Sequence, residues 1–549
     1  MKSKTGKHKL NKLFGASAYD AATDTNYEGA PSFVRGDEEA LVRVLTTGTF
    51  EHTFYATDVA LAREALDLFR QFAVDDPHFL AQAILYARNE GLMRIVPITA
   101  LVVLSTAASE DAREMFRRVF PRVILTPGDL QDFLTLCRQK QLRGMGKAVT
   151  HAAQRWLATL SQYHAIKYGS ASQDMSLRDI YRLTRPRLTG AANAIARYLV
   201  KGEVDPTLTQ IAGYEQFKRE ALEFKELHLA MTEREAGEAQ QSLLALIGEH
   251  RLPWEVVSGQ VAGAAAEVWA AMVRQMPYLA LLRNLNNAVK SGAVERDGVL
   301  EYITGTLADP ARVASGKIFP FQFYGALKAL KAEGEVEVAL RAALEQALDL
   351  SFVNMPALGR RVLIANDISG SMVAKPSPRG DMTMAEIASI FAAAAFKRAE
   401  EGTIVSFDTQ AHRREVSRAG SLAGIAKAIS AHDGGTSLSA PIEYAFGTTK
   451  DRTHPYDVAI FLTDSESWYD HLKTNRGSLD LIREYRTRIN PELKCFFVQL
   501  VPYRHAVVPQ DEPGCSYIYG WSASILSFIA AELAGGHAQV EHVRQVSVL

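Results

Sequence analysis

The spacing of hydrophobic residues changes near residue 355 and divides the chain into two parts. Between about residues 37 and 350, apolar side chains recur at helical intervals. Leu61, Ala65 and Phe72, for example, trace one face of a predicted helix. Short Pro, Gly or Asp signals separate such segments, and the period-two alternation of strands is nearly absent. So long a run of helices predicts a stacked helical-repeat array of the HEAT type rather than one bundle.

Beyond residue 355, short apolar runs typical of buried strands alternate with helical segments. The runs with strand character are VLIA after Arg361, TIVSF, DVAIFLT and KCFFVQL. Helices are predicted over residues 384–401, 421–430, 478–488 and 524–533. Thr383 and Glu386 form a capping box at the start of the first of them. This alternation predicts a doubly wound α/β domain with its functional site at the carboxyl ends of strands.

Oxygen-bearing side chains follow the first of these strands. Asp367, Ser369 and Ser371 occupy every second position after the apolar run. In an extended loop this spacing points three oxygens the same way, and Mg²⁺ or Mn²⁺ prefers oxygen ligands in near-octahedral arrangements. The same residues are also compatible with a Gly/Ser-rich turn whose hydroxyls only cap the next helix.

Two later segments favour the metal site over the simple turn. A loop with the sequence DGGTS contains Thr436, and a second apolar strand ends at Asp464. Together the segments resemble the metal-ion-dependent adhesion site (MIDAS) of von Willebrand factor A domains, in which the ion is left free to take a partner's carboxylate. The resemblance implies a site for Mg²⁺, or another divalent cation such as Mn²⁺, with the ligands Asp367, Ser369, Ser371, Thr436 and Asp464.

The segment between Cys137 and Lys201 is strongly basic although the whole chain is not. The chain carries 61 Lys and Arg against 62 Asp and Glu, a net charge of −1, so any surface for a polyanion must be local. In this segment Asp174 and Asp179 are the only acids, which leaves a net charge of roughly +10.

Three arginines of the basic segment stand at helical spacing. Arg178, Arg182 and Arg185 lie at i, i+4 and i+7 and form one stripe on the predicted helix SLRDIYRLTR. Phosphate backbones favour such a stripe, and Tyr181 beside it would offer a stacking face. The alternative is a solvated helix face paired with neighbouring acids. Tyrosines such as Tyr163, Tyr168 and Tyr181 more often pack in the core than stack on bases.

Length and cysteine usage add limits of their own. At 549 residues the chain exceeds one ordinary core, and 47% hydrophobic residues predict a globular protein. The three cysteines are odd in number and widely spaced, which favours buried thiols in a reducing compartment. No apolar signal core or membrane-length stretch is present. We therefore expect a cytoplasmic protein with a basic, flexible tail over residues 1–24.

Four segments of the helical part resemble the TROVE module of the Ro autoantigen family: GMGKAVTHAAQRWL, SLRDIYRLTRP, QMPYLALLRNLNN and KIFPFQFYGALKAL. In that family, too, a helical-repeat module precedes a von Willebrand factor A domain. The resemblance implies a Ro protein of the bacterial type. It also implies a HEAT-like TROVE ring over residues 25–355, followed by a doubly wound α/β von Willebrand factor A domain over residues 356–549.

The resemblance also implies ligands. Members of the family bind small noncoding Y RNAs on an outer basic surface and thread single-stranded 3′ ends of misfolded RNAs through the ring. The candidate RNA-binding residues here are Arg143, Lys147, Lys167, Arg178, Arg182 and Arg185. Two positions depart from the family pattern. Arg185 replaces a histidine and keeps a phosphate contact, and Ser465 interrupts the family's TDNE.

The leading hypothesis is an RNA-binding quality-control factor and scaffold, not an enzyme. The chain has no Walker A loop, no GxSxG elbow and no HExxH pair. The expected partners are a Y-like RNA, a misfolded RNA with a single-stranded 3′ end and an exoribonuclease such as polynucleotide phosphorylase. No membrane is expected, and a self-closed ring favours a monomer. The alternative is a protein-interaction adapter with a metal-dependent partner site and no role for RNA.

Overall fold

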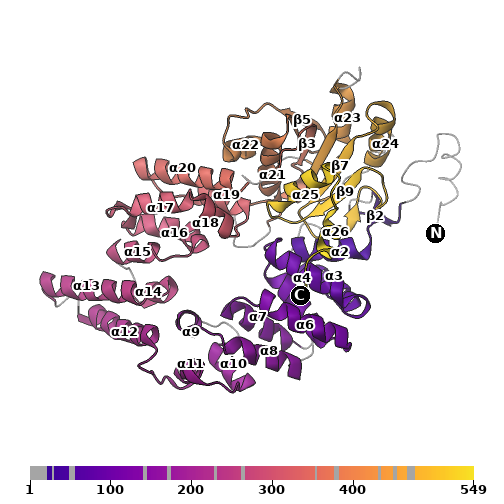
Figure 1. The fold of residues 1–549 in the computed structure, drawn as a ribbon. Coiled ribbons are helices and arrows are strands. Elements are labelled where there is room, and N and C mark those ends of the chain that lie inside the picture. Colours follow the sequence, from indigo (N-terminus) through magenta and orange to yellow (C-terminus); the bar gives the residue numbers. More distant parts are fainter. Residues whose placement is uncertain are drawn as a thin grey trace.

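The structure is a computed structural model that describes most of the 549 residues. The described residues are 22–27, 30–48, 56–139, 145–169, 175–227, 231–260, 266–352, 355–375, 382–430, 434–448, 454–466 and 477–549. Nearly all of the predicted tail therefore lies outside them. The described chain forms a helical array followed by an α/β domain, which we call the A domain (Figure 1). This arrangement confirms the predicted fold class.

The helical array runs from Asp37 to Leu350, with no strand in the parts of it that the structure describes. In Figure 1 it curves from α2 beside the A domain, through α8–α11 and α12–α13, back to α20 beside the A domain. Its helices are α2 (Asp37–Thr47), α3 (Asp58–Asp75), α4 (Pro77–Asn89), α5 (Ile95–Thr106), α6 (Glu110–Val123), α7 (Pro127–Cys137), α8 (Lys147–Leu157), α9 (Gln162–Gly169), α10 (Leu177–Thr184), α11 (Gly190–Lys201), α12 (Thr209–Leu227), α13 (Glu233–Glu249), α14 (Trp254–Gln260), α15 (Ala266–Val273), α16 (Tyr278–Lys290), the 3₁₀ helix η2 (Ala293–Glu295), α17 (Val299–Leu307), α18 (Pro310–Ser315), α19 (Pro320–Ala329) and α20 (Gly334–Leu350).

Local sequence explains where individual helices begin and which face they bury. Leu61, Ala65 and Phe72 of α3 are buried along one face, as their spacing predicts. The side chain of Asp76 accepts a hydrogen bond from the Phe79 N–H at 2.9 Å and caps α4, whose first residue is proline. Capping satisfies a backbone donor that the first helical turn leaves without a partner.

A buried helix and an ion-pair network around a buried aspartate hold the first part of the array together. The residues from Val96 to Leu104 in α5 are all buried, as expected of a helix that is apolar on every side. Asp129, at the start of α7, is 1% exposed. It accepts hydrogen bonds from Arg88 at 2.9 Å and Arg94 at 2.8 Å, and these bonds join α4 and the start of α5 to α7.

The A domain is built on a six-stranded sheet with the order β5-β4-β3-β6-β7-β9, parallel except for β5. Because β3 lies between β4 and β6, the switch point of the sheet falls at the carboxyl ends of β3 and β6. The elements are β3 (Arg361–Asp367), the 3₁₀ helix η3 (Gly370–Val373), α21 (Met384–Arg398), β4 (Glu401–Phe407), β5 (Ala411–Arg414), α22 (Leu422–Ile429), α23 (Ser439–Thr448), β6 (Val458–Thr463), α24 (Ser478–Arg488), β7 (Lys494–Gln499), β8 (His505–Ala506), β9 (Cys515–Tyr519), α25 (Ser524–Leu533) and α26 (Gln539–Arg544).

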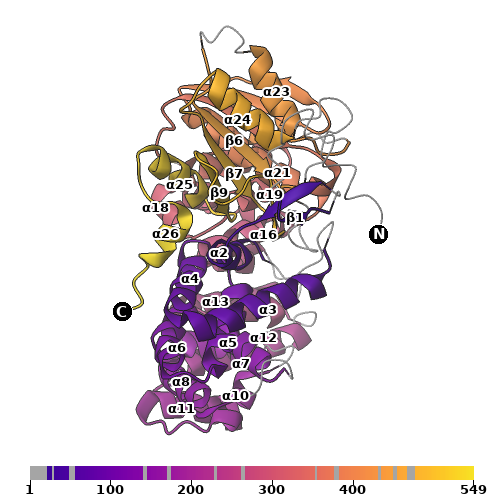
Figure 2. The same ribbon diagram turned by 90° about the vertical axis from the view of Figure 1, so that its right-hand side faces the viewer.

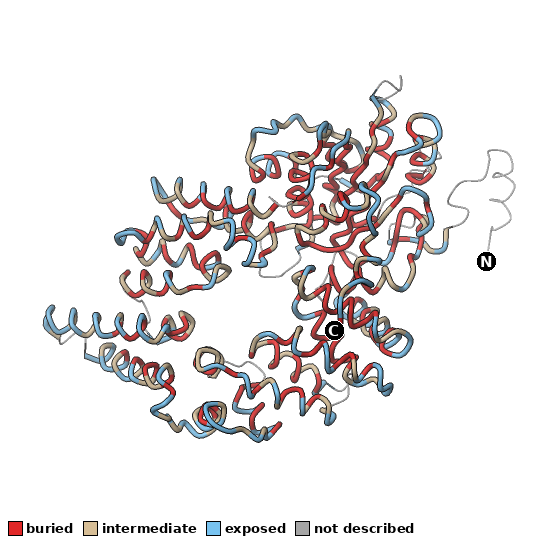
Figure 3. The backbone as a smooth tube through the Cα atoms, viewed as in Figure 1, coloured by how far each residue is buried: buried red, intermediate tan, exposed pale blue. Residues whose placement is uncertain are grey.

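Alternate residues of β3 face two different cores. Val362 and Ile364 pack with residues of α21, α22 and α25, and this core continues into the helical array. Leu363 and Ala365 pack with residues of α23 and α24 on the other face of the sheet. Buried residues accordingly fill the A domain, whereas α12 and α13 are exposed over much of their length (Figure 3).

An N-terminal strap joins the start of the chain to the A domain. The strap consists of residues 22–27 and 30–34 and carries β1 (Asp24–Thr25) and β2 (Pro31–Val34). Strand β2 pairs with β8 of the A domain, and Figure 2 shows β1 above α2 and α3. The predicted TROVE module starts at residue 25, so its first residues belong to this strap. The strap has no helical periodicity and pairs with the A domain instead of continuing the helical array.

The A domain contacts both ends of the helical array. At the first end, Gln539 donates to the Tyr86 hydroxyl at 2.9 Å, and Arg122 donates to the Ser547 carbonyl at 2.7 Å. At the last end, Arg398 donates to the Phe352 carbonyl at 2.9 Å. The array and the A domain thus close on one another.

Two further observations concern the state of the cysteines and the length and polarity of the helices. Cys137, Cys495 and Cys515 are free and buried, as predicted for thiols. In the part of the chain that the structure describes, every helix is too short or too polar to cross a bilayer.

Candidate metal centre and nucleic-acid interface

The carboxyl ends of β3 and β6 carry the two aspartates of the predicted metal centre. Asp367 is the last residue of β3, and Asp464 follows β6 directly. The Ser369 N–H donates to the Asp367 carboxylate at 2.9 Å, and the hydroxyls of Ser369 and Ser371 are 3.3 Å apart. The regular alternation of the loop thus keeps three oxygen-bearing side chains on one side, as the sequence predicts.

The threonine loop lies against the first metal loop. The Gly370 N–H donates to the Gly434 carbonyl at 2.9 Å, two residues before Thr436. A Cβ atom at Gly370 would lie 3.3 Å from that carbonyl, and Gly434 has a φ of +80°, so both positions suit glycine. Thr436 is 2% exposed. Loops from all three predicted segments therefore meet at the switch point of the sheet.

Burial and mutual repulsion characterise the two aspartates. Burial raises the pKa of Asp367 to about 6, and the nearby Asp408 charge adds to this effect, while hydrogen bonds from Ser369 and Thr463 oppose it. Burial, and then the charge of Asp367, raises the pKa of Asp464 well above its usual range. Two buried carboxylates of this kind favour a cation between them.

An orphaned oxygen shows that the residues present fit a divalent cation. Oδ2 of Asp464 is buried and has no hydrogen-bond partner. A buried carboxylate oxygen without a partner is costly unless a ligand completes it. With the hydroxyls of Ser369 and Ser371, it forms a donor set of hard oxygens, which suits Mg²⁺ or Mn²⁺.

Sequence reasoning missed Asp408 as a third carboxylate next to this centre. It follows β4, is 9% exposed and accepts hydrogen bonds from the Gln410 N–H and the His412 imidazole. No group of three or more His, Cys, Asp and Glu among the described residues is placed to hold a metal. The charge of Asp408 raises the pKa of Asp367. Its position at a strand end was the available signal.

Glu466 connects the metal loop to the N-terminal strap. It is fully buried, and its N–H donates to the Asp464 carboxylate at 3.0 Å. Its own carboxylate accepts from the Tyr27 N–H at 2.8 Å and contacts the His505 imidazole at 2.7 Å. No local pattern reveals this role, because one partner lies more than 400 residues away and the other lies in strand β8. Ser465, which lies between Asp464 and Glu466, has a φ of +64°, and asparagine is favoured in this region of backbone conformation.

Exposed cations gather on α8, α10 and the turn after α10. The Gln154 amide of α8 donates to the Thr184 carbonyl of α10 at 2.7 Å, which holds the two helices together. We call the exposed cations on these elements the basic face: Lys147, Arg155, Arg178, Arg182, Arg185 and Arg187. Asp179, the acid beside them, accepts hydrogen bonds from Ser176 in a capping box.

Most cations of the basic face have no carboxylate partner. In the described chain, Lys147, Arg155, Arg182, Arg185 and Arg187 form no ion pair, and Arg178 donates to the Leu199 carbonyl at 3.0 Å. Arg155 and Arg187 belong to the basic segment but were not among the candidates.

The structure corrects the length of the predicted arginine stripe and decides between the two interpretations of Tyr181. Helix α10 ends at Thr184, and Arg185 follows it as a left-handed cap with a φ of +48°. The stripe therefore consists of Arg178 and Arg182, with Arg185 beyond the helix end. Tyr181 is 5% exposed, so it packs in the core and offers no face to a base.

Two further candidates behave differently from the basic face. Lys167 pairs with Glu255 of α14 at 2.7 Å, and only 21% of the Lys167 side chain is exposed. It connects two helices of the array and is not available to a phosphate without losing that ion pair. Arg143 lies outside the described residues.

The fold and the metal loops together define a helical-repeat protein joined to a von Willebrand factor A-type domain. The family model of the TROVE domain matches residues 44–343, more than half of the 549-residue chain. The model of the Ro60 vWA domain matches residues 361–531. The chain belongs to the Ro family of TROVE-domain proteins, as its motifs predict.

Relatives and a solved structure agree with this membership. The chain is 28% identical to the RNA-binding protein RO60 of Deinococcus radiodurans over 473 residues, which cover 81% of this chain and 83% of that protein. It is 22% identical to the RNA-binding protein RO60 of Caenorhabditis elegans over 475 residues, which cover 76% and 72%. The crystal structure of the Deinococcus radiodurans RO (RSR) protein has the same fold, with a TM-score of 0.61 and 23% identity over 90% of this chain and 99% of that one.

Proposed function

We propose that this protein binds small noncoding, Y-like RNAs and the single-stranded 3′ ends of misfolded RNAs, and that it serves noncoding-RNA quality control. The basic face is the observation that carries the proposal. Its cations are exposed, and five of them have no ion-pair partner in the described chain. Arginine and lysine side chains in this state bind phosphate oxygens without first giving up another partner.

Closure of the array supports the proposed handling of 3′ ends. Helix α4 contacts the C-terminal α26, and helix α20 contacts α22 of the A domain. An array that starts and ends on the same domain can contact a single-stranded end from several sides. Because both ends of the described array contact the A domain, neither end is open to a second copy, which supports a monomer.

The metal centre supplies the second part of the proposal. Asp367, Ser369, Ser371, Thr436 and Asp464 would hold Mg²⁺ or Mn²⁺ directly or through water. The bound ion would supply a Lewis-acidic position for one carboxylate of a protein partner. The buried Oδ2 atom of Asp464 lacks a hydrogen-bond partner, so a cation bound there would complete its contacts. The hydrogen bond from Gly370 to Gly434 holds two of the metal loops together. Such a centre suits a scaffold that recruits an exoribonuclease, such as polynucleotide phosphorylase.

The protein acts in this proposal as a binding factor in the cytoplasm, not as an enzyme. Both named relatives are described as RNA-binding proteins. The three buried free thiols suit a reducing compartment. Two aspartates around one ion also fall short of the two-metal arrangement of many nucleases.

Filter binding with a hairpin RNA tests the proposal. The full chain should bind the hairpin with a single-stranded 3′ tail more tightly than the blunt hairpin, and the affinity should fall steeply with salt. Equal affinities for the two hairpins would remove the role of the 3′ end. Absent binding would favour the protein-interaction adapter, whose metal-dependent partner contact has no such salt slope.

A further inference from the structure

The N-terminal strap contacts the chain directly beside a candidate metal ligand. Glu466, two residues after Asp464, is fully buried and accepts a hydrogen bond from the Tyr27 N–H of the strap at 2.8 Å. The Glu466 N–H in turn donates to Oδ1 of Asp464 at 3.0 Å. One residue therefore holds the strap through its side chain and a candidate metal ligand through its backbone.

His505 of β8 extends the same network. Its Nδ1 atom lies 2.7 Å from the Glu466 carboxylate, and its Nε2 atom lies 3.9 Å from the Asp24 carboxylate of the strap. Asp24 also pairs with Arg504 at 2.8 Å. His505 is 3% exposed and is the partner of Val34 where β2 pairs with β8. If the strap left β8, the buried Glu466 carboxylate would lose its hydrogen bond from the strap, which is costly.

A second set of contacts runs beside the first. The Ser465 hydroxyl lies 3.5 Å from the Tyr517 hydroxyl of β9, which also accepts from the Val507 N–H at 2.7 Å. The Arg35 guanidinium, directly after the strap, lies 4.7 Å from the centre of the Tyr517 ring. Both residues that follow Asp464 are therefore connected to the strap or to the residue after it.

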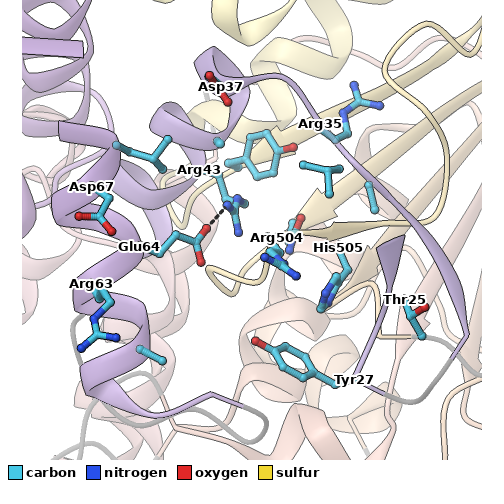
Figure 4. A pocket seen from close by; sticks show the side chains of 17 residues that line it. Thr25, Tyr27, Arg35, Asp37, Arg43, Arg63, Glu64, Asp67, Arg504 and His505 are labelled. Atoms are coloured by element: carbon cyan, nitrogen blue, oxygen red, sulfur yellow. Dashed lines mark hydrogen bonds and ion pairs between the residues drawn. The ribbon is translucent and has the colours of Figure 1, made fainter. Parts of the chain in front are cut away.

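Part of the strap faces a pocket on one side and the A domain on the other. The pocket of about 560 Å³ has Thr25 and Tyr27 on the strap side and Arg63 and Glu64 on the side of α3 (Figure 4). The Tyr27 ring meets the His505 imidazole edge-on at a centroid distance of 4.8 Å. Docking of this part of the strap therefore depends on the A-domain residues that also hold the metal loop.

The charges of this network make the metal centre and the strap depend on one another. Asp367, Asp464 and Glu466 are at most 1% exposed, and the charges of Asp367 and Glu466 both raise the pKa of Asp464. A divalent cation would compensate these charges and so favour the position in which the strap holds Glu466. Conversely, a docked strap fixes Glu466, whose N–H fixes Oδ1 of Asp464 and leaves the unpartnered Oδ2 for the cation.

We propose that cation binding at the metal centre and docking of the N-terminal strap stabilise one another, with Glu466 as the positioning residue that couples them. The strap leads into α2, so occupation of the metal centre is felt at the first helix of the array. The inference rests on the metal centre of the proposed function and adds its regulation. It involves neither RNA nor the basic face.

Hydrogen exchange of the full chain, followed by mass spectrometry on peptides from residues 22–34, tests the coupling. Exchange of these amides reports how often the strap undocks. Saturating Mg²⁺ should slow it by roughly tenfold, the factor expected for one hydrogen bond to a buried charge. By linkage, a docked strap tightens Mg²⁺ binding by the same factor. Helices α12 and α13, which lie across the array from the A domain in Figure 1, serve as the reference whose exchange should not change.

Glu466→Gln tests the positioning role. The amide keeps the size of the side chain but removes its charge and one of its two acceptor oxygens. In titration calorimetry the variant should still bind Mg²⁺, only more weakly, but saturating Mg²⁺ should no longer slow exchange of the strap. The matched control is Glu484→Gln on α24, where the glutamate pairs with Arg488. This control should keep the full effect of Mg²⁺.

Tyr27→Ala separates loss of docking from loss of coupling. The variant keeps the N–H that donates to Glu466 but loses the ring that packs on His505. Exchange of the strap should therefore be faster than in the parent protein both without and with Mg²⁺, while the ratio of the two rates stays the same. A purely structural change thus alters the rates but not their ratio.

The proposal is overturned if the parent protein binds Mg²⁺ in titration calorimetry while exchange of the strap stays the same, or if Glu466→Gln retains the full slowing. In both cases the metal centre stands without the coupling. Absence of Mg²⁺ binding by the parent protein would refute the metal centre and the coupling together. The first comparison uses only the parent protein, so it decides the question even where a variant fails to fold. Melting temperatures identify such a variant.

Discussion

The metal centre and the basic face present their charged groups in opposite ways. In the metal centre, the five candidate ligands are between 0% and 6% exposed, and the fold fixes their positions through backbone hydrogen bonds. On the basic face, the cations project from α8 and α10 into solvent, and most have no ion-pair partner in the described chain. The first site is rigid before its ligand arrives, whereas the second can adapt to different phosphate positions.

This difference has an energetic side. Buried like charges destabilise the folded protein unless a cation compensates them. The preformed metal centre therefore lowers the stability of the metal-free protein. Exposed arginines lose little by remaining unpaired in water. Substitutions should therefore change both stability and binding at the metal centre, but binding alone at the basic-face cations that lie within the helices.

The largest effect is expected for Asp367→Asn. Mg²⁺ binding should fall below detection in titration calorimetry, because the substitution removes a buried charged ligand. In metal-free buffer the same variant should be more stable than the parent protein by up to about 3 kcal/mol, since a shift of one pKa unit corresponds to about 1.4 kcal/mol. Asp511→Asn, an exposed position of the A domain, is the control and should change neither quantity.

The pH dependence of the metal-free protein follows from the same aspartate. Its pKa of about 6 in the folded state lies above its ordinary value of 3.8, so the folded state binds the proton more tightly than the unfolded state. The stability penalty is therefore complete above pH 6 and decreases as the pH falls toward 3.8. Denaturant melts across this range should show a steeper slope in the parent protein than in Asp367→Asn, where the buried Asp464 still carries a raised pKa. An equal slope in the two proteins, or Mg²⁺ that still raises the melting temperature of the variant, would contradict the assignment.

The sequence predicted which residues meet at the candidate metal centre more completely than it predicted the surfaces around it. Asp367, Ser369 and Ser371 stand at a fixed spacing after an apolar run, and local spacing alone determines how such a loop presents its oxygens. Asp408 was within reach of the same reasoning, because it also ends a strand. Glu466 was not, because its partners in the strap and β8 become neighbours only when the chain has folded.

The fold shows the same division between local and distant information. Helices α24 and α25 begin and end where their periodicity predicts, over Ser478–Arg488 and Ser524–Leu533. The edge strand β5, the two-residue strand β8 and the strap were not predicted. They are short, and their pairing depends on distant residues. On the surface, charge counting found the basic segment, but it could not separate the paired Lys167 from the unpaired Lys147.

The second largest effect is expected for the double variant Arg182→Ala with Arg185→Ala. Affinity for a hairpin RNA should fall roughly tenfold to a hundredfold, and the slope of affinity against salt should decrease by about 2, one for each lost phosphate contact. The control is Arg117→Ala with Arg118→Ala on α6, where both arginines are paired with glutamates. If both double variants weaken RNA binding equally, net charge rather than the basic face determines affinity.

A smaller effect should separate Lys167 from Lys147. Lys167→Ala should destabilise the protein by about 1 kcal/mol, because it leaves Glu255 partly buried without its cation. Lys147→Ala removes an exposed, unpaired charge and should leave stability unchanged while it lowers RNA affinity. Denaturant melts and filter binding of the two variants provide the comparison. A stable Lys167→Ala protein with weakened RNA binding would place Lys167 with the basic face.

The smallest effect concerns the left-handed backbone of Arg185, where stability and binding meet in one residue. A side chain with a φ of +48° carries a steric cost that glycine avoids, so Arg185→Gly should stabilise the protein by about 0.5–1 kcal/mol. Arg185→Ala keeps the Cβ atom and the cost, and should leave stability nearly unchanged. Both variants remove the guanidinium and should weaken RNA binding to the same extent. Equal melting curves would mean that the helix end relaxes without its left-handed cap, whereas unequal RNA affinities would mean that the backbone shape itself positions the basic face.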